Sequence, residues 1–429
     1  MLLVGVVLVL TLSFVPYSLT ILANWQHRIT SAVVSSGEPQ IPPPQQKQAP
    51  EPAFDAATWY AARGEAPETH GVLIETLDGG RALASHNADE IFNPASLIKL
   101  ATSLAALKKL GADYRFQTRV YVDGTIDTAG TLRGRLYVSG HDPTFGDAGA
   151  ALIAKELRAL GVKRLGEDLY VSPDFSFNFS ESPDESAKRL SNALHLGSLK
   201  TSVAEEPAGK HVLTLYSHPL RDVLLYMNAR SSNFIAERLG AMVGGPQGIQ
   251  QFLVEELKLA PEKVTIERAS GREHNRLTPR ELVAVIRALV EEEKRQGLEP
   301  ADIMPVASDD AGTLRRRLAG TRLEGAVVGK TGTLTSEVDG GMASLAGLVY
   351  TRDLGPIVFA ILDQGSRIGD NRQLEDQLLA EVIGGQSTPL PVGSPTPRQY
   401  LPSAGLRVER ENVEGVRQGV IDSTEKSNH

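Results

Sequence analysis

Hydrophobic and polar positions divide the chain into alternating, helical and irregular stretches. Gly71–Leu77 alternates as a strand does, and the turn residues Asp78-Gly79-Gly80 separate it from a second run, Arg81–Ser85. This pattern predicts a β-hairpin. Asn93-Pro94 then precedes a helical pattern that ends at Gly111. Asn suits an N-cap, Pro the first helical position and Gly the position after a helix, so we expect a helix between them.

From residue 115 to about Tyr216 the pattern changes to short alternating runs broken by Gly and Asp, with one helical stretch at Asp147–Leu160. Such runs predict a β-rich segment. Beyond it helical periodicity returns, and strand-like runs and a last helix follow. The helical stretches are Asp222–Leu239, Pro246–Leu257 and Pro279–Val290, the strands Ala326–Thr335, Met342–Thr351 and Pro356–Leu362, and the last helix Asp370–Ile383.

The order of these elements favours an α+β fold. Strands from both ends of the folded region would pair in one antiparallel sheet with helical layers, and the β-rich segment would interrupt it as an inserted lobe. We therefore assign residues 53–114 and 217–386 to one domain and residues 115–216 to the insert. A length of 429 residues is ample for two such units.

The two ends of the chain differ from the rest in composition. Met1–Ala23 is almost wholly apolar and uncharged, and about 20 such residues span a bilayer, so residues 1–24 are predicted as a signal peptide or membrane anchor. The Pro/Gln-rich residues 25–52 predict an extended linker. The Pro-rich and polar residues 387–429 predict a disordered tail. The first segment indicates export, and its sequence leaves open whether it is cleaved.

Composition excludes some chemistry. The chain has no cysteine, which rules out disulfides and thiolate metal sites. Its formal net charge is −8 and no Lys/Arg block stands out, which argues against a nucleic-acid partner.

Candidate nucleophilic chemistry begins at Ser96-Leu97-Ile98-Lys99. Ser96 and Lys99 are three positions apart on the expected helix and share one face. A serine hydroxyl needs a base, and Lys99 serves only when neutral, which requires its pKa to fall by about 3 units from about 10.4. Burial and a nearby cation lower a lysine pKa, and Lys330 is the candidate cation. The alternative is an ordinary amphipathic helix with an extended Lys side chain.

Two further segments complete the constellation. Ser231-Ser232-Asn233 lies between helical runs, where Ser231 would face Lys99 and relay a proton and Asn233 would bind a substrate amide. The alternative is a plain turn or cap. Lys330-Thr331-Gly332 lies on an expected strand, with Lys330 near a substrate carboxylate and Gly332 marking close approach of another backbone. The N–H groups of Thr333 and Ser96 would form an oxyanion hole, although a solvent-facing strand lysine is the simpler alternative.

Together these segments resemble the D-alanyl-D-alanine carboxypeptidase/endopeptidase family of low-molecular-mass penicillin-binding proteins, which are active-site serine peptidases. The resemblance covers roughly residues 70–385. Besides the three segments it rests on FNPASLIK at 92–99, LYVSGHDPTF at 136–145, YSHP at 216–219, NARSSNFIAE at 228–237, NRLTP at 275–279, AGTLRRRL at 311–318 and GKTGTL at 329–334.

The resemblance implies a β-lactamase/transpeptidase-like fold and a peptidase that acts on peptidoglycan stem peptides in the periplasm or at the outer face of the cytoplasmic membrane of a bacterium. Ser96 would form the acyl-enzyme, which β-lactams mimic as covalent inhibitors, and Lys99 would be the base. Ser231 and Asn233 would complete the catalytic group, and Lys330, Thr331, Gly332 and Thr333 would bind substrate. No metal or cofactor is implied, and residues 1–23 could meet a membrane.

The chain departs from this family at four places. Ser232 replaces a frequent Asp, the insert is short, Ala269–His274 differs from the expected Gly-Ser-Gly-Leu-Ser-Arg type of run, and Ser336–Gly341 is acidic and Gly-rich. Carboxypeptidase and endopeptidase therefore stay open. A β-lactamase, for which we find no Glu-x-x-Leu-Asn after Asn233, and a non-catalytic penicillin-binding scaffold are the rival interpretations.

Overall fold

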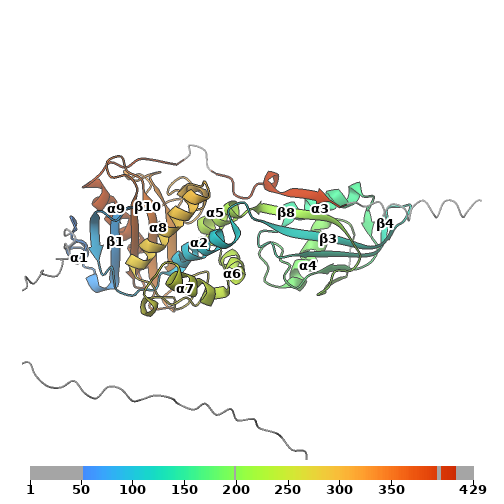
Figure 1. Cartoon of the computed structure of the whole chain (residues 1–429), viewed down its shortest axis with the longest axis horizontal. Coiled ribbons are helices and arrows are strands. Elements are labelled where there is room, and N and C mark those ends of the chain that lie inside the picture. Colours follow the sequence, from blue (N-terminus) through green and yellow to red (C-terminus); the bar gives the residue numbers. More distant parts are fainter. Residues whose placement is uncertain (1–51, 198–199, 394–397, 412–429) are drawn as a thin grey trace, which may run out of the picture. The chain divides into compact units, whose positions relative to one another are not determined.

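The computed structural model describes residues 52–197, 200–393 and 398–411 (Figure 1). The predicted signal or anchor segment, nearly all of the predicted linker and residues 412–429 lie outside them. Within the described ranges, no helix is both long and apolar enough to cross a membrane.

A five-stranded antiparallel sheet is the centre of the first structural unit. Its order is β2-β1-β11-β10-β9, so the N-terminal hairpin pairs with the last strands of the chain, as predicted. The strands are β1 His70–Thr76, β2 Ala82–His86, β9 Val327–Leu334, β10 Met342–Val349 and β11 Ile357–Gln364.

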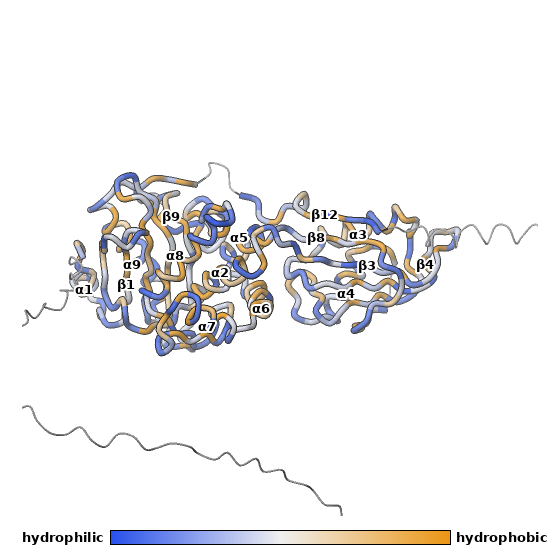
Figure 2. The backbone as a smooth tube through the Cα atoms, in the orientation of Figure 1, coloured by the Kyte–Doolittle hydropathy of each residue, from blue (hydrophilic) through white to orange (hydrophobic). Residues whose placement is uncertain are grey.

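Both faces of this sheet are covered by helices. Alternate residues of one strand enter different cores: Val358 packs with α2 and α8, and Phe359 packs with α1 and α9. The inner strands β10 and β11 are therefore buried along nearly their whole length. Figure 2 shows the hydropathy of each segment along the same backbone. The helices are α1 Ala56–Ala61, α2 Ile98–Leu110, α5 Leu220–Arg230, α6 Asn233–Met242, α7 Gly245–Glu255, α8 Pro279–Arg295 and α9 Ile368–Gly384.

The start of α2 differs from the prediction. Asn93 is not its N-cap, because a 3₁₀ turn, Ala95–Leu97, intervenes and the α-helix begins at Ile98. The predicted stop at Gly111 is confirmed, with a φ of 84°. The expected helix Asp222–Leu239 is two helices, because Ser231 adopts left-handed backbone angles and ends α5.

The insert has its own sheet and core. Its seven strands follow the order β12-β8-β3-β4-β6-β7, with β5 pairing with β4. Helices α3 Asp147–Ala159 and α4 Pro183–Leu194 pack with this sheet around a separate hydrophobic cluster. The strands are β3 Arg115–Ile126, β4 Thr131–Gly140, β5 Arg164–Leu165, β6 Leu169–Val171, β7 Thr201–Val203, β8 Lys210–Pro219 and β12 Arg407–Arg410.

Helix α4 was not predicted, although its start carries a recognisable signal. Pro183 occupies the first helical position, and the Ser182 side chain accepts a hydrogen bond from the Glu185 N–H. Serine at the N-cap followed by proline is typical of a helix start.

The predicted disordered tail is wrong for residues 398–411. Strand β12 pairs antiparallel with the edge strand β8, where Arg407 is opposite Tyr216. The backbone of β8 supplies the hydrogen-bonding partners, and Val408 packs on the insert core. Because only one of the four residues of β12 is apolar, composition carried no strand signal.

Candidate active site

Ser96 lies in the 3₁₀ turn immediately before α2 and is half-exposed. The turn is held in an uncommon conformation: Ala95 has a φ of 53°, and the Asn93 side chain accepts a hydrogen bond from the Ala95 N–H at 3.0 Å. Positive φ costs a non-glycine residue free energy, so the surrounding contacts must fix this turn.

Two glycines allow other segments to approach the Ser96 turn closely. A Cβ atom at Gly332 of β9 would lie 2.8 Å from the Pro94 carbonyl oxygen and 2.1 Å from Ser344 Oγ. A Cβ atom at Gly271 would lie 2.0 Å from the Ala95 carbonyl oxygen. The close approach expected at Gly332 is thus present, and the 268–276 loop approaches the turn in the same way.

Lys99 lies one helical turn after Ser96, and its side chain is fully buried. Its Nζ is 3.0 Å from Ser96 Oγ, 2.8 Å from Asn233 Oδ1 and 2.5 Å from the Ser270 carbonyl oxygen. A neutral amine has two hydrogens and one lone pair. Asn233 Oδ1 and the Ser270 carbonyl only accept, so they take both hydrogens and the lone pair is left for the Ser96 hydroxyl proton.

The environment of Lys99 favours the neutral amine. Burial lowers the pKa of Lys99 to about 7; the Glu237 carboxylate opposes the shift and the Arg272 guanidinium adds to it. The predicted size of the shift agrees with this value. The cation that lowers the pKa of Lys99 is Arg272. The predicted repulsion between the two lysines is present, but it acts on Lys330, whose pKa is lowered by burial and by the charge of Lys99.

Helix α6 supports Lys99 twice. Asn233 and Glu237 are four residues apart on one face of the helix. Asn233 accepts from Lys99, and Glu237 accepts from the Ser270 N–H at 3.1 Å, which fixes the peptide whose carbonyl meets Lys99.

The second segment connects Ser231 to Lys330 rather than to Lys99. Ser231 has a φ of 52°, and its Oγ accepts from Lys330 Nζ at 3.0 Å. Ser232 is the N-cap of α6, and its side chain accepts from the Ile235 N–H. An Asp can fill the same capping role, which explains why the replacement at this position preserves the local fold.

Lys330 is fully buried, and its Nζ also donates to the Thr331 carbonyl at 2.6 Å. Burial first, and then the positive charge of Lys99 in its protonated form, lower the pKa of Lys330 well below its ordinary value. Its amine faces Ser231 and the Thr331 carbonyl, and Lys330 is not among the residues that line the cavity. A contact between Lys330 and a substrate carboxylate stays a prediction.

A cavity of about 520 Å³ opens beside Ser96. It brings together residues of all three segments with three arginines. Its lining consists of Ser96, Ser231, Asn233, Thr313, Arg316, Arg317, Thr331, Thr333 and Arg372. The N–H groups of Ser96 and Thr333 as an oxyanion hole stay a prediction. Within the described residues, no cluster of His, Cys, Asp or Glu could hold a metal ion.

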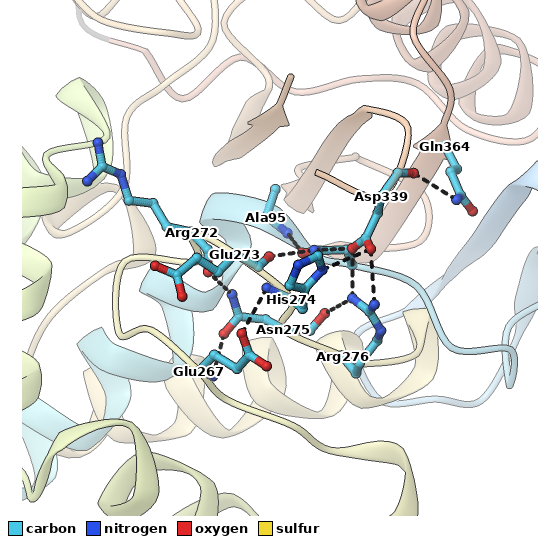
Figure 3. Close-up of polar contacts among 10 residues, drawn as sticks. Ala95, Glu267, Arg272, Glu273, His274, Asn275, Arg276, Asp339 and Gln364 are labelled. Carbon is cyan, nitrogen blue, oxygen red and sulfur yellow. Dashed lines mark hydrogen bonds and ion pairs between the residues drawn. The ribbon is translucent and has the colours of Figure 1, made fainter. Parts of the chain in front are cut away.

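A polar network ties the two unusual loops to the Ser96 turn (Figure 3). Asp339, from the β9–β10 loop, receives hydrogen bonds from both Nη atoms of Arg276, at 2.8 and 3.1 Å, and from Asn93 Nδ2 at 2.6 Å. His274 Nδ1 lies 3.0 Å from the same carboxylate. Partial burial raises the pKa of Asp339, but these hydrogen bonds outweigh it and bring the pKa to about 2.

Sequence reasoning missed Ser270, Asp339, Arg316 and Arg372. Ser270 acts through its backbone carbonyl, which leaves no trace in residue type. The 269–274 and 336–341 runs were noted as departures, and that was the available signal for Asp339. Arg316 lies in the quoted AGTLRRRL run, but the spacing does not tell which arginine faces the cavity.

Residues 60–188 and 176–381 match the D-Ala-D-Ala carboxypeptidase 3 (S13) family, so the match covers most of the chain. A D-alanyl-D-alanine carboxypeptidase from Actinomadura sp. (strain R39) is 35% identical over 100 residues, which are 23% of this chain and 19% of that protein. The alignment thus spans about a fifth of this curated relative.

Solved structures with a similar fold include the predatory endopeptidase Bd3459 of Bdellovibrio bacteriovorus, 21% identical with a TM-score of 0.67, over 77% of this chain and 96% of that one. Penicillin binding protein 4 (dacB) from Haemophilus influenzae is 18% identical with a TM-score of 0.59, over 72% of this chain and 96% of that one. At these identities the likeness concerns the fold, and the α+β prediction is confirmed.

Proposed function

Because the chain belongs to the D-Ala-D-Ala carboxypeptidase 3 (S13) family, a family of hydrolases, we propose that it cleaves the peptide bond after D-Ala in peptidoglycan stem peptides through an acyl-enzyme on Ser96. The observation that carries the proposal is the arrangement at Lys99: its buried Nζ, with a pKa lowered to about 7, lies 3.0 Å from Ser96 Oγ.

In the acylation step, Ser96 Oγ attacks the carbonyl carbon of the D-Ala residue while its proton moves to Lys99 Nζ. An oxygen–carbon bond forms, and the negative charge that develops on the carbonyl oxygen needs hydrogen-bond donors nearby. The Ser96 and Thr333 N–H groups are the proposed donors.

Collapse of the tetrahedral intermediate breaks the carbon–nitrogen bond, and the leaving amine takes a proton. The proton that Lys99 took from Ser96 passes to the leaving nitrogen, which leaves Lys99 neutral again. Ser231 is the proposed relay for this proton, because its hydroxyl lines the same cavity and is positioned by the Lys330 amine at 3.0 Å. Water then adds to the ester with Lys99 again as base, and the peptide leaves with a new carboxylate.

The neighbours support a serine acyl-enzyme and penicillin binding. One solved structure of similar fold is described as penicillin G acylated Bd3459, a predatory endopeptidase, at 21% identity. The Actinomadura relative is named as a carboxypeptidase. The proposal therefore includes covalent inhibition by β-lactams at Ser96.

Residues 1–24 add a proposed location. An apolar segment of this length at the N-terminus supports export, and the peptidoglycan substrate lies outside the cytoplasmic membrane. Fractionation of the full-length protein tests this proposal, and recovery in the cytoplasm would reject it.

The function is tested by incubating the purified protein with monomeric and cross-linked muropeptides, followed by mass spectrometry, with Ser96→Ala as the inactive control. Loss of one Ala from monomers identifies a carboxypeptidase, and splitting of cross-linked dimers identifies an endopeptidase. Penicillin labelling without either reaction would favour the scaffold, and rapid steady turnover of a chromogenic cephalosporin would favour a β-lactamase.

A further inference from the structure

Two exposed arginines line the Ser96 cavity without a counter-ion. Arg316 follows the Thr313 segment, and Arg372 lies in the first half of α9. Both side chains are exposed, and neither forms an ion pair with another of the described residues. An arginine stays charged at any physiological pH, so both guanidinium groups carry full positive charge into the cavity.

The third arginine of the cavity is different. Arg317 is buried and forms ion pairs with Glu375 and Asp376, both at 2.7 Å. Its charge is therefore neutralised inside the protein. Because the cavity lining includes no acidic residue, the net charge of the lining comes from Arg316 and Arg372.

Local contacts place these arginines beside the strand on which substrate would dock. Arg372 Nη2 donates to Thr333 Oγ1 at 2.7 Å, and Thr333 lies on β9 two residues after Thr331. Thr331 in turn donates to Thr313 Oγ1 at 2.7 Å, which ties the segment preceding Arg316 to the same strand. Both arginines thus lie near strand β9, whose Lys330 also contacts Ser231, the proposed relay to the leaving amine.

We propose that Arg316 and Arg372 determine substrate specificity by binding a carboxylate on the leaving-group side of the scissile bond. This inference rests on the proposed function, in which the leaving amine is an amino acid. The carboxylate of a leaving amino acid is attached to the carbon next to the scissile nitrogen, so it enters the same cavity as the attacked carbonyl. A guanidinium group binds a carboxylate through two parallel N–H···O hydrogen bonds, which gives geometric selectivity as well as charge.

The alternative anchor is Lys330, and its position argues against it. Its side chain is fully buried, its amine is engaged by Ser231 and the Thr331 carbonyl, and it does not line the cavity. The arginines are the cations that an incoming carboxylate meets.

The test uses two peptides that differ only in this group: diacetyl-Lys-D-Ala-D-Ala and the same peptide with a C-terminal carboxamide. We expect kcat/KM of the wild-type protein to be much higher for the acid. Each of Arg316→Gln and Arg372→Gln should lower kcat/KM for the acid by about tenfold, mainly through KM, and leave the amide nearly unchanged.

Arg315→Gln is the matched control, because Arg315 is also exposed and adjacent but does not line the cavity. It should leave the ratio of acid to amide unchanged. If Arg316 and Arg372 were merely structural, their replacement would lower kcat/KM for the acid and the amide peptide together. An unchanged ratio of the two kcat/KM values in the double variant Arg316→Gln/Arg372→Gln therefore overturns the proposal.

A second measurement separates this proposal from the proposed function. The acylation rates with benzylpenicillin and with its methyl ester report the same discrimination without peptide hydrolysis. Loss of the acid preference in the arginine variants supports the specificity proposal even if neither peptide is cleaved, which would reject only the peptidase function. Equal rates for acid and ester in the wild-type protein would reject the arginine proposal alone.

Discussion

The candidate active site holds two pairs of basic side chains in opposite surroundings. Lys99 and Lys330 form a buried lysine pair, with both side chains fully buried and both pKa values lowered by burial. Arg316 and Arg372 form an exposed arginine pair that lines the cavity and keeps its charge.

The difference indicates how one site can use basic side chains both for proton transfer and for substrate binding. A lysine amine can lose its proton at accessible cost, so burial converts it into a base that carries a lone pair. A guanidinium cannot be deprotonated in a protein, and exposure preserves it as a binding group. Residue type and burial together therefore separate proton transfer from recognition.

The largest effect is expected for Lys99→Arg, which puts a guanidinium group in place of the buried lysine amine. The guanidinium stays protonated and offers no lone pair to Ser96, so we expect acylation by fluorescent penicillin to slow by at least about 10³-fold. Circular dichroism of the variant provides the control for folding. A rate within tenfold of the wild-type protein would contradict the role of Lys99 as the base.

The second prediction concerns pH. Because the pKa of Lys99 is about 7, the neutral fraction falls about tenfold for each pH unit below that value. The acylation rate should therefore drop by about fiftyfold from pH 7 to pH 5 and level off above pH 8. A rate that is flat across this range would show that Lys99 is neutral throughout or is not the base.

The third prediction concerns the network that holds the loop beside Lys99. Asp339→Asn weakens the hydrogen bonds from Arg276 and His274, and we expect the free energy of unfolding to fall by about 1–2 kcal/mol near pH 7. Chemical denaturation measures this loss. His274→Gln should cost less, because that side chain is about half exposed.

The sign of the pH effect follows from the lowered pKa of Asp339. An unfolded Asp titrates near 3.9 and the folded one at about 2, so the stabilisation is complete above pH 4 and is lost as the pH falls towards 2. The difference in stability between wild type and Asp339→Asn should shrink over that interval. A difference that stays constant down to pH 2 would show that the carboxylate charge is not what stabilises the loop.

The smallest effect expected is that of salt. Raising ionic strength from about 0.05 to 0.5 M shortens the screening length and weakens the exposed arginine pair, so KM for an acidic peptide should rise about two- to fivefold. The pH midpoint of acylation should hardly move, because a buried amine is screened much less. A midpoint shift as large as the KM change would remove the distinction between the two pairs.

Sequence patterns predicted most of the central domain. Strand alternation and turn residues placed the hairpin and the last three strands within a few residues of their observed bounds, since both cores select apolar residues there. Sequence patterns failed where a segment is stabilised by another segment that is distant along the chain. The polar β12 is a strand because the edge of β8 accepts it, and Ser96 lies in a 3₁₀ turn because Asn93 and the close backbone of β9 hold Ala95 at positive φ.

By itself the sequence determined the family and the α+β class and predicted the reactive residues, because hydrophobic periodicity and side-chain chemistry are local properties of the chain. Only the tertiary structure decided which neighbour each group meets. It gave the buried amine of Lys99 the Ser270 carbonyl as an acceptor, turned Lys330 inward to Ser231, and left Arg316 and Arg372 facing the cavity. Burial and hydrogen-bond partners set protonation and orientation, and both depend on segments that are distant along the chain.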